Sequence, residues 1–127
     1  ELMLLARKDS KMKKILLVDD DENIREAIPH VLSFMAPKEF EFETAKNGKE
    51  ALEKVLAQGE INYFYALVTD FNMPEMDGGE LIREILKREI FFPRIIVVSG
   101  EVDNEMILKD ILTTKPYVFF LKKPTSP

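Results

Sequence analysis

Acidic residues follow two apolar runs in this 127-residue chain, and lysines follow a third. Asp19, Asp20 and Asp21 come directly after Ile15–Val18, and Asp70 comes directly after Tyr65–Thr69. Continuous apolar runs are typical of parallel strands covered on both faces, and the carboxyl ends of such strands meet at one edge. Carboxylates gathered there repel each other, and a hard divalent cation such as Mg²⁺ relieves the repulsion. If the two strands lie side by side in the sheet, the acids that follow them can therefore share a divalent cation.

A structural role is the alternative for these acids, because Asp is common at helix caps and in turns. Capping needs one acid, whereas this chain places three in a row at residues 19–21. The chain contains no cysteine and a single histidine, His30, so disulfides, thiol chemistry and a zinc site of His and Cys ligands are not expected.

Composition indicates an ordinary soluble globular domain, with 46% hydrophobic and 32% charged residues. The length suits one domain with one core. A net charge of -5 gives no general reason to expect nucleic-acid binding, and the basic residues between Arg7 and Lys14 favour a solvated tail. No apolar run reaches the roughly 18 residues of a membrane span. We therefore expect a cytoplasmic protein with neither nucleic acid nor membrane as a partner.

Strand and helix patterns alternate along the chain. Apolar runs predict strands at 15–18, 40–45, 65–69, 94–99 and 117–122. Helical spacing predicts helices after Asp21, after Asn47-Gly48, after Gly79 and at 103–112. Pro29 lies inside the first of these and is expected to kink it. This alternation predicts an α/β fold with a doubly wound parallel sheet.

Four separated motifs resemble the receiver domain of two-component response regulators, in the order of that family. They are Asp19-Asp20, Asp70-Phe71-Asn72-Met73-Pro74 with Asp77-Gly78, Ser99-Gly100, and Lys123-Pro124. The resemblance implies a flavodoxin-like, five-stranded parallel sheet of order 2-1-3-4-5, with the site between strands 1 and 3. It covers residues 14–127 as a receiver domain and leaves residues 1–13 as an N-terminal extension.

The resemblance also implies a role for each site residue. Asp70 is the phosphoacceptor, and Mg²⁺, or Mn²⁺ in its place, is held by Asp20, Asp70 and the backbone carbonyl of Asn72, with Asp19 binding through water. Lys123 and Ser99 contact the phosphoryl group. Lys122 competes with Lys123, and strand alternation sends these two lysines to opposite faces.

Two further features follow from the family pattern. Ser99 and Phe120 form a coupled hydroxyl–aromatic switch, although a core role for Phe120 is an equal alternative. Asn72 and Glu101 stand two residues beyond the phosphoacceptor and the switch hydroxyl, where side chains tune the access of water. Because both are small or polar here, we expect a short-lived phosphoryl state.

The implied function is a phosphoacceptor rather than an enzyme: a sensor histidine kinase or a phosphotransfer protein donates the phosphoryl group, and a protein-interaction face switches. One alternative is a Mg²⁺-dependent phosphatase of the haloacid dehalogenase kind, because Asp19-x-Asp21 fits the start of that signature. Asn23 departs from it, and the motif from Asp70 to Pro74 is left unexplained. The other alternative is a degenerate receiver that only binds partners, which would lack an acid or the lysine.

The chain departs from the family after strand 5, where the pattern of a fifth helix is missing. We expect Val98, Val118 and Phe120 to lie on the face that this helix would cover. Residues 1–11 include the apolar segment Leu2–Ala6, and we expect them to form a helix over that face, within one chain or across a homodimer. A tag or a linker is the alternative for this segment.

Overall fold

The computed structural model of this protein describes residues 12–36, 38–58, 63–100 and 117–122. Strands and helices alternate from Lys13 to Ser99 as the sequence predicts. The elements are β1 (Lys13–Val18), α2 (Glu22–Met35), β2 (Phe40–Ala45), α3 (Gly48–Leu56), β3 (Ala66–Asp70), α4 (Gly78–Lys87), β4 (Ile95–Ser99) and β5 (Val118–Lys122).

The strands form one parallel sheet in the order β2-β1-β3-β4-β5, which confirms the predicted topology. Val18 at the end of β1 lies beside Thr69 of β3, and Asp70 lies beside Val98 of β4. The chain therefore leaves β1 and β3 at the same level and at the same edge of the sheet. This register brings the residues that follow the two strands together.

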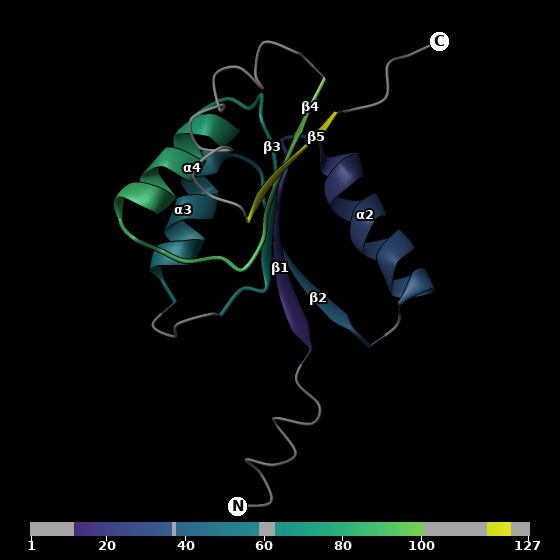
Figure 1. Cartoon of the computed structure of the whole chain (residues 1–127). Helices are drawn as coiled ribbons and strands as arrows, with labels where there is room; N and C mark the ends of the chain where they lie inside the picture. The colour runs from purple at the N-terminus through teal and green to yellow at the C-terminus, as the bar shows by residue number, and fades with distance from the viewer. Residues whose placement is uncertain (1–11, 37, 59–62, 101–116, 123–127) are drawn as a thin grey trace, which may run out of the picture.

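Helices cover the two faces of the sheet unequally. Figure 1 shows α3 and α4 on one side and α2 on the other. The main core lies between the sheet and the α3–α4 layer. Its side chains with almost no exposure include Leu16, Leu67, Leu81, Ile82, Ile85, Phe92, Ile95 and Val97.

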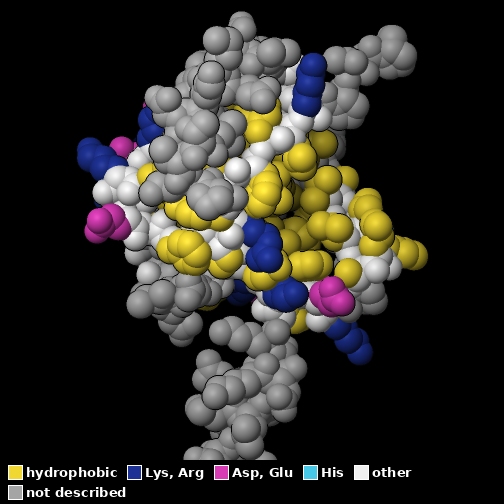
Figure 2. All heavy atoms as spheres, viewed as in Figure 1, with side chains coloured by type: hydrophobic (Ala, Val, Ile, Leu, Met, Phe, Trp, Pro, Cys, Tyr) yellow, Lys and Arg dark blue, Asp and Glu magenta, His cyan; other side chains and the backbone are white. Residues whose placement is uncertain are grey.

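Helix α2 packs loosely against its face of the sheet. Asp21 caps it, and the helix continues through Pro29 to Met35 without burying any side chain. A cavity of about 650 Å³ lies between α2 and the sheet, with Ile24 and Ile28 on the helix side and Val68 and Val98 among the strand residues. Figure 2 shows hydrophobic side chains gathered around this hollow.

The face of the sheet toward α2 is called the open face below. It carries different β5 residues from those predicted. Val98 does line the cavity. Val118, however, is buried in the main core, and Phe120 packs against that core from the same side of β5. Phe119 and Leu121 are the exposed β5 residues, at 50% and 54%. The prediction was wrong by one residue, because alternation reverses the face at each step and two adjacent phenylalanines hide that phase.

The predicted helix at 103–112 and the predicted cover formed by residues 1–11 lie outside the described residues. Within the described part of the chain, no helix combines the length and the apolar content needed to cross a membrane.

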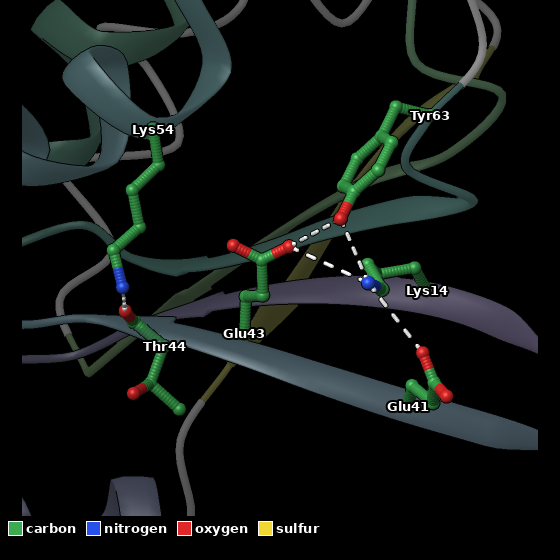
Figure 3. A network of polar contacts seen from close by, with 6 residues as sticks. All are labelled: Lys14, Glu41, Glu43, Thr44, Lys54 and Tyr63. Atoms are coloured by element: carbon green, nitrogen blue, oxygen red, sulfur yellow. Dashed lines mark hydrogen bonds and ion pairs between the residues drawn. The ribbon is translucent and has the colours of Figure 1, made fainter. Parts of the chain in front are cut away.

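A polar network ties β1 and β2 to the segment that precedes β3, at the end of the sheet opposite the acidic residues (Figure 3). Lys14 of β1 donates a 2.7 Å hydrogen bond to the Tyr63 hydroxyl, which donates a 3.0 Å bond to Glu43 of β2. Lys14 also lies 3.4 Å from a carboxylate oxygen of Glu41. The hydrogen bond to Tyr63 raises the pKa of Lys14, and Glu41 raises it further. The Lys14 ammonium therefore keeps its proton, and these contacts persist, until the solution is strongly alkaline.

Because the two faces of the sheet are packed unequally, replacing isoleucine by alanine should lower the free energy of unfolding by different amounts on each face. Ile85→Ala removes a side chain with no exposure in α4 and should lower the free energy of unfolding by about 2–5 kcal/mol. Ile28→Ala removes a side chain that is 37% exposed in α2 and should cost about 1 kcal/mol. Urea denaturation of both variants, with unchanged slopes, measures the difference.

Equal costs would mean that the inner face of α2 is covered in solution. Deleting residues 1–11 from the same pair of variants would then identify the cover. A cost for Ile28→Ala that falls after the deletion assigns the cover to that segment, and an unchanged cost excludes that segment.

Candidate functional site

Three carboxylates meet where β1 and β3 end. Asp70 is the last residue of β3, and Asp19 and Asp20 directly follow β1. One carboxylate oxygen from each residue lies within 4.8 Å of the other two. Asp19 and Asp70 are buried, at 7% and 6% exposure, whereas Asp20 is exposed at the mouth of the site. The sequence predicted this cluster, and the parallel register of the strands assembles it.

Backbone contacts fix Asp19 in place. Its amide donates a 3.1 Å hydrogen bond to the Ala45 carbonyl at the end of β2. Its carboxylate accepts a 2.9 Å bond from the Asp21 amide, and its carbonyl accepts a 2.8 Å bond from the Arg25 guanidinium. The turn from β1 into α2 therefore holds the Asp19 side chain toward β3.

Asp21 has a different role from its two neighbours. Its carboxylate accepts a 2.9 Å hydrogen bond from the Asn23 amide and caps α2. The capping role that was weighed for the acidic run thus applies to Asp21, while Asp19 and Asp20 join Asp70 in the cluster.

The chain after Asp70 is held in a tight turn. The Phe71 amide donates to the Val98 carbonyl at 2.9 Å, and the Phe71 carbonyl accepts from the Gly78 amide at 2.7 Å. A Cβ at Gly78 would lie 2.3 Å from the Asp70 carbonyl oxygen, so only glycine fits there. Asp77 then caps α4 in a capping box with Glu80. The loop between β3 and α4 therefore begins and ends at fixed points.

The donor set of the cluster suits a hard cation. Carboxylate oxygens are the ligands that Mg²⁺ prefers, and it commonly uses one or two of them together with a phosphate. The described residues of the cluster offer oxygen donors only, without the nitrogen or sulfur that favours zinc. The site also opens into the cavity beside α2, whose lining includes Asp19, Asp20 and Asp70. This arrangement can hold a divalent cation beside two buried carboxylates.

The other predicted site residues differ in their burial, and two of them are not described. Ser99 ends β4 and has no exposure, and Asn72 is exposed in the loop after Asp70. Phe120 is half-buried, with Val97 as its neighbour in the register of β4. Lys122 is exposed, whereas Lys123 and Glu101 lie outside the described residues.

One contact near the site was not predicted. The sequence indicated Asn47-Gly48 only as a turn before a helix, but the Gly48 amide donates a 3.0 Å hydrogen bond to the Met76 carbonyl in the β3–α4 loop. The two residues are far apart in the sequence, and each has an ordinary local role. No local pattern signals their contact.

Comparison with known proteins agrees with this geometry. A family model described as the response regulator receiver domain matches residues 15–127. The transcriptional regulatory protein CpxR homolog of Haemophilus influenzae is 42% identical over 91 residues, which are 71% of this chain and 36% of that protein. The chemotaxis protein CheY1 of Helicobacter pylori is 36% identical over 96 residues, covering 74% of this chain and 73% of that protein.

Solved structures give the same result. The response regulator protein TrrA from Thermotoga maritima, in complex with Mg²⁺-BeF, aligns with a TM-score of 0.68 and 29% identity, covering 91% of this chain and 90% of that one. Some curated relatives are much longer: the chain spans 44% of the PhoP regulator of Bacillus subtilis. The match over residues 15–127, together with the acidic cluster at the ends of β1 and β3, shows that this chain belongs to the receiver domain family of two-component response regulators.

Proposed function

We propose that Asp70 accepts a phosphoryl group from the phosphohistidine of a sensor histidine kinase or of a phosphotransfer protein. The observation that carries this proposal is the meeting of Asp19, Asp20 and Asp70 within 4.8 Å at the edge of the sheet. In doubly wound sheets, ligands bind outside the carboxyl ends of the strands where the strand order reverses, which here is between β1 and β3.

In the proposed reaction a carboxylate oxygen of Asp70 attacks the phosphorus atom. The new oxygen–phosphorus bond forms as the nitrogen–phosphorus bond of the donor breaks, and the imidazole keeps the electron pair. Asp20, Asp70 and the Asn72 carbonyl would hold Mg²⁺, with Asp19 binding through water. When bound, the ion neutralises charge on the carboxylates and on the phosphoryl oxygens.

Lys123 and Ser99 complete the proposed site. We assign this role to Lys123 over Lys122, because Phe119 and Leu121 lie on the open face and the same alternation, if it went on past the described residues, would place residue 123 with them. Asp70 and Val98 line the cavity on that same face. The Ser99 hydroxyl would donate to the phosphoryl group, and Phe120, half-buried at the end of the sheet, would move with it to change a protein-interaction face.

The two other readings are less well supported. A phosphatase of the haloacid dehalogenase kind would use Asp21 in catalysis, but this carboxylate caps α2. A degenerate binding module would lack part of the acidic cluster, and all three acids are present and close together. We therefore propose a signalling domain that is labelled once rather than an enzyme with continuous turnover, acting in the cytoplasm on an output partner.

Magnesium should stabilise the fold through this cluster. At a concentration of 100 times its Kd, the ion should add about 2.7 kcal/mol to the free energy of unfolding. Asp20→Asn should abolish this gain by removing one ligand. Asp21→Asn is the matched control, because Asn caps a helix as well as Asp does and the residue lies outside the cluster. Thermal unfolding with and without Mg²⁺ measures both; an equal loss in the two variants would place the ion elsewhere.

Phosphorylation should require Mg²⁺, Asp70 and Lys123. With acetyl phosphate as donor, intact-protein mass spectrometry should show one added phosphoryl group on the unchanged chain and none on Asp70→Asn. Lys123→Ala should still bind Mg²⁺ but react about a hundredfold more slowly, because it loses one charged partner of the phosphoryl oxygens. Lys122→Ala removes the same charge one residue away and should react normally. The reverse result for the two lysines would show that the assignment on β5 is wrong by one residue.

The phosphorylated state should be short-lived. Asn72 and Glu101 leave water access to the acyl phosphate in this proposal, so Asn72→Met with Glu101→Leu should slow its hydrolysis several-fold by excluding water. Glu53→Leu places a similar side chain on an exposed position of α3 and should leave the decay unchanged. Loss of the phosphorylated mass after removal of acetyl phosphate gives the rates. A decay that the double substitution leaves unaltered would remove water access as the explanation.

A further inference from the structure

The loop that follows Asp70 contains an unusual stretch of backbone. Glu75 and Met76 both have positive φ, at 49° and 82°. Residues other than glycine rarely adopt this left-handed region, and they remain there only when surrounding contacts compensate for the strain. The pair lies between Asn72, whose carbonyl is a proposed ligand, and Asp77, which caps α4. Whatever holds this pair also sets the path of the loop beside the acidic cluster.

The N-terminus of α3 supplies the compensating contacts. The first amides of a helix lack partners inside it, and here two of them bind the loop. Gly48 donates a 3.0 Å hydrogen bond to the Met76 carbonyl, and Lys49 donates a 3.3 Å bond to the Glu75 carbonyl. The Asn47 side chain donates a further 3.3 Å bond to the Glu75 carboxylate while it caps α3 by accepting from Glu50. The left-handed turn thus points its two carbonyls at α3.

This contact leaves no room for a side chain at residue 48. A Cβ there would lie 2.4 Å from the Met76 carbonyl oxygen and 2.8 Å from the Met76 Cγ. The φ of Gly48 is not positive, so glycine is required for space and not for backbone conformation. Any larger residue must push the Met76 carbonyl, and the loop with it, away from α3.

The opposite end of the loop is equally constrained. Phe71 and Met73 are buried in the main core, and the Gly78 amide binds the Phe71 carbonyl. The loop is therefore anchored by the core on one side and by the N-terminus of α3 on the other. Asn72 lies three residues before Glu75 in this loop, so its carbonyl belongs to the short segment whose path the two sets of contacts determine.

We propose that Gly48 and Asn47 are positioning residues for the cation at the acidic cluster: the N-terminus of α3 clamps the β3–α4 loop and thereby sets the place of the Asn72 carbonyl. This inference rests on the proposed function for the role of that carbonyl. Residues at the start of α3 contribute no ligand in this proposal, but through the clamp they affect how tightly the acidic cluster binds the cation.

The test compares Mn²⁺ binding, followed by electron paramagnetic resonance of the free ion, in variants of the 127-residue chain. Gly48→Ala should weaken binding by about tenfold or more, as is usual when a group that orients a metal ligand is lost. Val55→Ala is the matched control, because Val55 is buried on the same helix and its truncation lowers stability without touching the loop. It should change the Kd by less than about twofold.

Asn47→Ser gives a second variant if Gly48→Ala does not fold. Serine keeps the cap of α3 but lacks the amide that binds Glu75, so binding should weaken while the thermal midpoint without metal stays close to that of the unchanged chain. Unaltered affinity in either folded variant, or an equal loss in Val55→Ala, would overturn the clamp. Absence of Mn²⁺ binding in the unchanged chain, or binding that Asp20→Asn leaves intact, would overturn the proposed function itself.

Discussion

Repulsion among three carboxylates is the constraint on which this site depends. The parallel register of β1 and β3 brings Asp19, Asp20 and Asp70 within 4.8 Å of one another, and two of the three are buried. Such an arrangement is costly without a cation, since like charges in a poorly solvated place repel strongly. Hydrogen bonds from Arg25 and from the Asp21 amide hold Asp19 there nevertheless. The fold therefore maintains a site that a divalent ion and a phosphoryl group would complete.

The rest of the molecule divides into a well-packed layer and a loosely packed one. Helices α3 and α4 bury their apolar sides against the sheet. Helix α4 begins at the end of the loop that follows Asp70, and the first amides of α3 bind that loop. Helix α2, in contrast, borders a cavity and buries no side chain. The acidic cluster lies at the boundary of these layers. The loop after Asp70 is held from the well-packed side, while the carboxylates open toward the less densely packed side.

Sequence patterns predicted the strands and the acidic cluster because both arise from local rules. Buried parallel strands appear as continuous apolar runs, and a residue such as Asp70 at the end of a run lies at the edge of the sheet. Two features escaped this reasoning. Two adjacent phenylalanines, Phe119 and Phe120, hide which residues of β5 point toward the core. The contact between Gly48 and Met76 joins segments that are distant in the sequence. Tertiary packing decides such features, and no local signal carries them.

The central claim is that one carboxylate of the cluster, Asp70, becomes the acyl phosphate. Borohydride reduction of the phosphorylated chain converts an acyl phosphate side chain to the corresponding alcohol, and peptide mass spectrometry then identifies the residue. The account predicts reduction at Asp70 alone, and only after treatment with a phosphoryl donor and Mg²⁺. Reduction at Asp19 or Asp20, with Asp70 unmodified, would contradict it.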